Sequence, residues 1–260
     1  IVGTVSGTSI SFGSESVFNA GNTGTVVAEY DSTNNKVVIA FQDIPNSDRG
    51  RAIVGTVSGT SISFGTPVTF TPDYTNSFSV TFDPTVGKVV ITYRDGGNSY
   101  YGTAIVGTVS GTSISFGSTI IFESDNTNRI SATFDSTNNK VVIAYTDNGN
   151  SYYGTAVVFT QTGFPVHQLG SETVFESAST NENRATFDST NNKVVVAYRD
   201  NGNSAYGTAR VGTVSGTSIT FGSKSVFESG TAEYITPIYD STNGKVVIAY
   251  RDSGNSYYGT

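Results

Sequence analysis

The chain has 260 residues, a net charge of −7 at neutral pH, no cysteine and 13% charged residues. This composition disfavours a nucleic-acid partner, which needs clustered Lys and Arg, and it excludes disulfides and thiolate-bound metal sites. No apolar run is long enough for a membrane-crossing helix, so we expect no membrane insertion. With 16 Phe and 15 Tyr the chain can build a core, and its Val, Ile, Thr, Tyr and Phe favour strands over helices.

A unit of about 52 residues is repeated five times along the chain. Its marker lysines are Lys36, Lys88, Lys140, Lys193 and Lys245, spaced by 52, 52, 53 and 52 residues. Self-similarity at this period is typical of propellers, solenoids and tandem arrays. We therefore expect one repetitive domain over residues 1–260.

Each unit contains four strand signals separated by turn signals, and the second unit shows the end of the pattern. There we expect a third strand over 103–109 and a tight turn at 110–112. A fourth strand should follow over 113–122. Gly117 interrupts that strand and predicts a bulge, because glycine tolerates the backbone angles that a bulge needs.

The third unit shows the beginning of the pattern. We expect a first strand over 130–134, a polar turn at 135–139 and a second strand over 140–145. A loop over 146–151 leads to a third strand that starts near Tyr153. The second strand is apolar on both faces, which indicates a sheet stacked between two neighbours instead of one facing water.

The predicted fold is therefore all-β, a five-bladed β-propeller with four antiparallel strands per blade. The blades would span about 24–72, 73–124, 125–177 and 178–228, with a fifth formed by 229–260 plus 1–23. We expect the N-terminal strands (about 1–18) to pair with the C-terminal strands (about 233–258) and close the ring. Joining Thr260 to Ile1 recreates the repeat except for one Ala, and closure would pair strand edges that otherwise promote aggregation. The alternative is an open array cut from a longer protein.

The two-hairpin unit resembles the blades of five-bladed propellers, including lectins of the tachylectin kind and the sialidase-like group. The segment Val109–Phe116 is similar to the Asp-box turn of sialidase-type blades, with Phe116 where that box has Trp and with its Asp missing. The amino-acid sequence of the repeat is also similar to tandem repeats of large secreted or virus-particle proteins. This resemblance implies the architecture, whereas the role has to be argued from the loops.

The loop between the second and third strands carries the candidate ligand-binding side chains. In a propeller it lies on the same face as the connection between blades, for example Glu123–Arg129. Guanidinium, carboxylate and amide groups would bond sugar hydroxyls there, and exposed Tyr rings would pack on the sugar. The candidate residues are Arg94, Asp95, Asn98, Tyr100, Tyr101, Tyr152, Tyr153, Arg199, Asp200, Asn203, Tyr206, Arg251, Asp252, Asn255, Tyr257 and Tyr258.

A purely structural interpretation of the same loop stays open. Its Arg and Asp side chains could form ion pairs between blades, and Asn-Gly could simply make the turn. The Tyr side chains could pack in the core with their hydroxyls at the rim.

The sequence favours binding over catalysis. His167 is the only histidine, and the acidic residues recur in near-equivalent surroundings, whereas glycoside hydrolysis needs two carboxylates in different environments. The repeated turn aspartates, such as Asp135, are expected to cap turns, since a calcium site needs six or more oxygens. We therefore expect no catalytic residue, no metal and no cofactor.

The leading hypothesis is a non-enzymatic binding or display module with multivalent weak binding of glycans at repeated inter-blade sites. The main alternative is a purely structural module: a decoration of a virus particle or cell surface, or a consensus-like repeat protein, without a small ligand. A glycosidase is a third alternative, which the repetition disfavours. The Gly-, Ser-, Thr- and Asn-rich surface without Cys, Met or Trp predicts an extracellular or particle-surface location.

Overall fold

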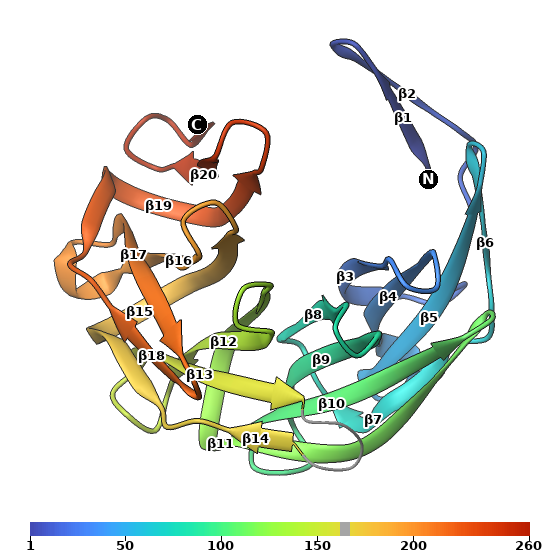
Figure 1. Ribbon diagram of the computed structural model, residues 1–260, viewed down its shortest axis with the longest axis horizontal. Helices are drawn as coiled ribbons and strands as arrows, with labels where there is room; N and C mark the ends of the chain where they lie inside the picture. Colours follow the sequence, from blue (N-terminus) through green and yellow to red (C-terminus); the bar gives the residue numbers. More distant parts are fainter. Residues whose placement is uncertain (162–166) are drawn as a thin grey trace.

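The computed structural model describes residues 1–161 and 167–260, which form an all-β structure without any α-helix (Figure 1). The all-β class predicted from the sequence is confirmed. Residues 162–166, inside the third predicted blade, lie outside the described residues. No helix in the described part of the chain has the length and hydropathy that a membrane crossing requires.

The strands follow one another in five similar units. The first unit holds β3 (Thr23–Asp31), β4 (Lys36–Asp43), β5 (Arg49–Ser58), β6 (Ser61–Phe64) and β7 (Val68–Tyr74). The second holds β8 (Phe78–Asp83), β9 (Lys88–Asp95), β10 (Tyr101–Ser110) and the beginning of β11 (Ser113–Asp135). The third holds the rest of β11, β12 (Lys140–Asp147), β13 (Tyr153–Gln161), β14 (His167–Leu169) and the beginning of β15 (Thr173–Asp188).

The fourth and fifth units continue the same order. The fourth holds the rest of β15, β16 (Lys193–Asp200), β17 (Tyr206–Ser215), β18 (Ser218–Phe221) and the beginning of β19 (Ser225–Asp240). The fifth holds the rest of β19, β20 (Lys245–Asp252) and the short β21 (Tyr258–Gly259). A separate hairpin of β1 (Gly3–Ser6) and β2 (Ser9–Phe12) precedes the first unit.

All pairings within the units are antiparallel, and they join the units into large sheets. The strands β11, β15 and β19 are long because each runs from the outer edge of one unit into the first strand of the next. Units two to five therefore share one 14-stranded sheet, whereas β3 to β7 form a five-stranded sheet. Figure 1 shows the units following one another along an arc.

The turn and the bulge that the sequence predicts in the second unit are present. Ser110 pairs with Ser113 across a tight turn, where Gly111 has a φ of 61°, a backbone angle that glycine adopts without strain. The partner of Ile105 is Thr119, whereas the partner of Gly107 is Phe116. The outer strand therefore carries one extra residue beside Gly117, which is the predicted bulge.

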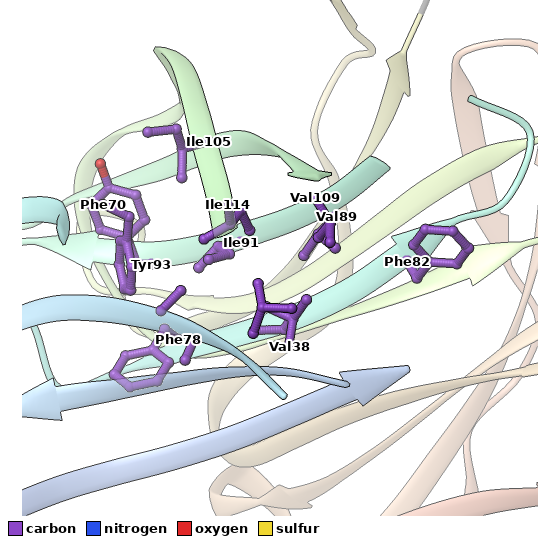
Figure 2. Packing of buried hydrophobic residues seen from close by; sticks show 14 residues of the cluster. Val38, Phe70, Phe78, Phe82, Val89, Ile91, Tyr93, Ile105, Val109 and Ile114 are labelled. Atoms are coloured by element: carbon purple, nitrogen blue, oxygen red, sulfur yellow. The ribbon is translucent and has the colours of Figure 1, made fainter. Parts of the chain in front are cut away.

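The core lies between successive units. In β9, Val89, Ile91 and Tyr93 pack in a cluster shared with the first unit, whereas Val90 packs in a cluster shared with the third. Figure 2 shows the first of these clusters, with side chains from β4 and from β7 to β11 gathered in one place. The second strand of the unit is thus buried on both faces, as its apolar sequence indicates.

The predicted closure of the ring is wrong for this structure. Among the described residues the strand β1 pairs only with β2, and β20 pairs with β19 and with β21 near its end. Figure 1 shows the two chain ends on opposite sides of a gap. The apolar side chains that closure would cover remain exposed: Val5, Ile10 and Phe12 on the hairpin, and Ile238 and Val247 in the fifth unit.

The N-terminal segment packs against the first unit. Phe18 packs edge-on against Phe41 and Phe64, with ring centroids 5.2 and 6.0 Å apart. A Cβ atom built on Gly13 would lie 1.9 Å from the carbonyl oxygen of Thr60, so the hairpin end sits directly against the β5–β6 turn. The sequences at the two ends of the chain continue one another as parts of the same repeat. This match does not determine the rotation between neighbouring units, on which closure of a ring depends.

The side chain of Glu29 in β3 should make stability depend on pH. Burial raises the pKa of Glu29 from 4.5 to about 7. The folded chain then binds more protons than the unfolded chain between these values, so the free energy of unfolding falls as the pH rises through this window. The expected loss is on the order of 1–2 kcal/mol, allowing for partial exposure of the carboxyl group.

The variant Glu29→Thr provides the matched control, because Thr81, Thr133 and Thr186 stand at the same register in the next three units. Urea unfolding at about pH 5 and about pH 8 should show a smaller pH dependence in this variant than in the wild type. Equal pH dependence in both proteins would show that Glu29 keeps its ordinary pKa.

Candidate functional site

The loop that joins the second and third strands has a similar backbone in all five units. In four of them an Asp ends the second strand and faces the Tyr that opens the third: Asp95 faces Tyr101, Asp147 faces Tyr153, Asp200 faces Tyr206 and Asp252 faces Tyr258. The first unit has Asp43 facing Arg49 instead. Sixteen candidate residues from the sequence lie in these loops or at their ends.

The aspartates at the start of these loops already have partners within the protein. The carboxylate of Asp95 accepts the amide of Gly97 at 3.1 Å, and that of Asp252 accepts the amides of Gly254 and Asn255 at 2.8 and 3.1 Å. Asp200 is buried, with its Oδ2 2.8 Å from the ammonium of Lys224. Burial raises the pKa of Asp95 above its ordinary value. Asp95 and Asp252 thus contribute to the shape of their own loops, whereas Asp200 is bonded to a lysine from outside its loop.

The asparagines in the middle of the loop also make turn contacts. The amide of Tyr101 bonds to the carbonyl of Asn98 at 3.0 Å, and the amide of Tyr258 bonds to that of Asn255 at 3.0 Å. Asn203 lies in the short 3₁₀ helix Asn201–Asn203. These contacts place the asparagines in a fixed backbone turn, and they indicate a structural role.

The first tyrosine of each pair is held in an unusual backbone conformation at the loop tip. Tyr100, Tyr152 and Tyr257 have φ angles of 65°, 62° and 63°, in the left-handed region that bulky residues rarely adopt. Their side chains are 39%, 54% and 63% exposed. Such conformations persist only where the surrounding structure enforces them, and they are frequent at binding sites.

Backbone hydrogen bonds on both sides enforce this conformation. In the second unit the amide of Gly96 bonds to the carbonyl of Tyr74 at 2.9 Å, and the carbonyl of Tyr100 accepts the amide of Thr127 at 3.1 Å. In the third unit the carbonyl of Tyr152 accepts the amide of Thr180 at 2.9 Å. The loops of the second and third units are thus fixed between the connection that precedes the unit and the connection that follows it, and the loop of the fifth unit is bonded to the preceding connection through the amide of Ser253.

A guanidinium group lies on one of these rings in the second unit. The Cζ atom of Arg94 is 3.9 Å from the ring centroid of Tyr100, within the range of cation–π attraction. Its Nε donates to the Oδ1 of Asn126 at 3.2 Å, and Tyr74 meets Tyr100 edge-on at 6.5 Å. Residues from two connections therefore complete the site around Tyr100.

The fifth unit has a similar arrangement with an added carboxylate. The Cζ of Arg251 is 5.1 Å from the ring of Tyr257 and 4.7 Å from that of Tyr234. Its Nε donates to Glu233 at 3.0 Å, and the hydrogen bonds from Arg251 lower the pKa of Glu233. Arg199 also lies 3.5 Å from Glu233. One ion pair between units, Arg199 with Glu233, therefore exists here, although its acid is Glu233 and not the loop Asp that the structural interpretation named.

The third and fourth units each lack one member of the arginine–tyrosine pair that the second and fifth units have. The third has Thr146 in place of Arg, buried and bonded to Thr180, so Tyr152 stands without a guanidinium. The fourth has Arg199 but carries Ala205 at the left-handed position. The second tyrosines (Tyr101, Tyr153, Tyr206 and Tyr258) open their strands and are less exposed in the middle units than Tyr258.

Sequence reasoning missed three contributors to these sites: Tyr74, Glu233 and Tyr234. All three lie in connections between units, at positions where other units carry different residue types, so the repeat pattern does not mark them. The connection after the second unit was expected on the same face as the loops, and Asn126 from that connection does reach Arg94. Tyr74, Glu233 and Tyr234 could have been found by examining, in each unit separately, the residues of the connection that is expected beside the loop.

A separate cavity of about 430 Å³ lies between the first strands of the units. Its lining includes Ser77, Ser131, Arg129 and Arg184, and the described lining contains none of the sixteen candidates. The cavity and the loop tips are therefore distinct places on the molecule.

The loop tips offer fixed aromatic rings, guanidinium donors and amide groups. This chemistry suits reversible contact with a ligand that has both a hydrophobic face and hydroxyl groups. No protein-family model matches the chain, and no curated protein matches it.

Proposed function

We propose that this protein is a non-enzymatic binding module that binds glycans weakly and at several loop tips at once. The observation that carries the proposal is the set of exposed tyrosines, Tyr100, Tyr152 and Tyr257, held in left-handed conformations by bonded loops. Rings that are ordered before binding lose little conformational entropy when a ligand packs on them.

The chemistry of the tips fits a sugar. A pyranose ring has a face of C–H groups that packs on an aromatic ring, and its hydroxyls accept hydrogen bonds from guanidinium groups such as Arg94 and Arg251. A single exposed ring gives a weak contact. Three tips on one rigid scaffold would raise the overall affinity for a multivalent glycan by about 10²–10⁴-fold.

We also propose that the five units are the blades of a β-propeller. The repeated order of four antiparallel strands supports this interpretation, as do contacts between the first strands of neighbouring units, β3 with β8, β8 with β11, β11 with β15 and β15 with β19. In this architecture the second-to-third-strand loops lie on one face, which is the arrangement that multivalent binding needs.

Sugar binding should depend on the individual loop-tip tyrosines. The variants Tyr100→Ala, Tyr152→Ala and Tyr257→Ala should each weaken binding of a monovalent sugar at that tip by about fivefold, since a stacked ring contributes about 1 kcal/mol. Isothermal titration of sugars selected on a glycan array measures this effect.

The fourth unit supplies a matched variant. Ala205→Tyr adds a ring beside Arg199 at a position that already has a φ of 62°, so the stoichiometry of bound sugar should increase. Absence of binding to any sugar at millimolar concentration would refute the glycan proposal.

A structural role in a larger assembly is the second candidate function. The exposed apolar side chains of the hairpin and of the fifth unit favour it, because large exposed apolar patches mark contact surfaces. The role would be a decoration of a particle or cell surface, which fits the proposed extracellular or particle-surface location. Electron microscopy of the native source would show whether the units are built into such an assembly.

A further inference from the structure

Three carboxylates meet at the interface of the second and third units. Glu123 comes from β11, Asp147 ends β12, and Glu172 directly precedes β15. One carboxylate oxygen from each lies within 4.8 Å of the other two. Glu123 is 6% exposed and Asp147 is 5% exposed, so water screens their repulsion only in part.

The groups that contact these carboxylates in the described part of the chain are neutral. Tyr145 donates its hydroxyl to Glu123 Oε2 at 3.2 Å, and the amide of Asp125 donates to Glu123 Oε1 at 3.0 Å. The amide of Asn150 donates to Asp147 Oδ1 at 3.0 Å. None of the ion pairs formed by the described residues involves this cluster. Burial and the neighbouring Glu172 raise the pKa of Glu123 to about 7.

At the interface of the third and fourth units, a positively charged side chain occupies the equivalent position. There Glu176 stands for Glu123 and Asp200 for Asp147, and Tyr198 donates to Glu176 at 2.9 Å as Tyr145 does to Glu123. The third corner is Lys224, which occupies the repeat position of Glu172. Its ammonium lies 3.2 Å from Glu176 and 2.8 Å from Asp200.

The first unit also has a positive charge in this neighbourhood. Arg51 faces Phe41 across the β4–β5 pairing, and its guanidinium reaches Asp43 at 3.0 Å. Asp43 is the counterpart of Asp147. Two units thus place a cation beside this aspartate, whereas the second–third interface places a third carboxylate there.

A buried hydroxyl without a partner among the described residues lies on the same face of the sheet as Tyr145, whose hydroxyl bonds Glu123. Thr155 is the counterpart of Arg51, because it faces Tyr145 as Arg51 faces Phe41. Its side chain therefore leaves β13 toward Asp147, as that of Arg51 leaves β5 toward Asp43. Thr155 is 1% exposed, and its Oγ1 has no hydrogen-bond partner among the described residues. A hydroxyl oxygen in this position is a neutral ligand for a metal ion.

We propose that Glu123, Asp147 and Glu172, with the hydroxyl of Thr155, bind a divalent cation of the calcium class. Calcium takes six to eight oxygen ligands in flexible geometry, and three carboxylates together with a hydroxyl and water can supply them. The ion takes the place that the ammonium of Lys224 fills at the next interface. It joins the second unit to the third at the base of the loop that carries Tyr152.

Exchanging the third corner between the two interfaces tests this site. The variant Glu172→Lys copies the arrangement of Lys224 and should lower calcium affinity at least about 100-fold, because it replaces a ligand by a fixed positive charge. It should also raise the melting temperature measured in EDTA. The reverse variant, Lys224→Glu, should bind one calcium ion more than the wild type and should recover in calcium the stability that it loses in EDTA.

Isothermal titration with calcium chloride and thermal unfolding with calcium or EDTA measure both effects. Wild type should bind calcium and melt at a higher temperature in its presence. The proposal is overturned if the wild type binds no calcium at millimolar concentration, or if Glu172→Lys binds it with unchanged stoichiometry and affinity. Should Lys224→Glu fail to fold in EDTA, Glu172→Lys still decides the matter. Sugar binding at Tyr100 and Tyr257 is measured separately, so either proposal can fail alone.

Discussion

Replacing Phe175 by Ala is expected to lower the free energy of unfolding by about 3–5 kcal/mol, as is usual for a large aromatic side chain removed from a core. Phe175 is fully buried, and its ring lies 5.2 Å from that of Tyr198 and 5.6 Å from that of Phe221. It also covers Gly154, where a Cβ atom would lie 2.3 Å from the ring. Urea unfolding measures the loss directly.

The repeat provides the control for this substitution. Phe227 is the counterpart of Phe175 and packs on Tyr250 at 5.3 Å, but it is only partly buried because the fifth unit lacks outer strands. Phe227→Ala should therefore cost less than half as much as Phe175→Ala. If Phe175→Ala does not fold, Phe175→Leu should still show a loss of about 1–2 kcal/mol. Equal losses at Phe175 and Phe227 would contradict the difference in packing between the units.

Replacing Gly65 by Ala is the second large effect, with an expected loss of about 3 kcal/mol. A Cβ atom on Gly65 would lie 1.8 Å from the carbonyl oxygen of Thr112, in the β10–β11 turn of the next unit. The φ angle of Gly65 is not in the left-handed region, so the cost comes from the forced separation of two units and not from backbone strain.

Gly222 occupies the same repeat position without a neighbour. The nearest atom to a Cβ on Gly222 is the carbonyl oxygen of Val211, at 3.8 Å. Gly222→Ala should therefore change stability by less than about 0.5 kcal/mol. In a closed ring Thr8, the counterpart of Thr112, would lie against Gly222, and this substitution would then be as harmful as Gly65→Ala.

Much of the fold follows from the sequence because local patterns determine it. The apolar second strand over 140–145 predicts β12, and the bulge at Gly117 follows from a glycine inside a strand pattern. The closure does not follow, because the match between Thr260 and Ile1 describes repeat phase only. The path of the array depends on small rotations between units, which the phase of the repeat does not determine.

The candidate site is predictable only in part for a similar reason. The loop tyrosines and arginines were identified as repeated residues, and the structure places Arg94 on Tyr100 and Arg251 beside Tyr257. The sequence could not show that Asp95 and Asp252 bond the backbone of their own loops. The sequence also did not reveal the three-carboxylate cluster. Glu172 stands where the next unit has Lys224, and a residue that departs from the repeat is most simply interpreted as random divergence after duplication.

An NMR titration of the isotope-labelled protein with the sugars selected on a glycan array tests the proposed role of the loop tips most directly. Binding at the tips predicts shifts of the backbone amides of Tyr100, Tyr152 and Tyr257, with little change at Ala205. Shifts confined to the cavity between the first strands, or no shifts at millimolar sugar, would contradict the proposal.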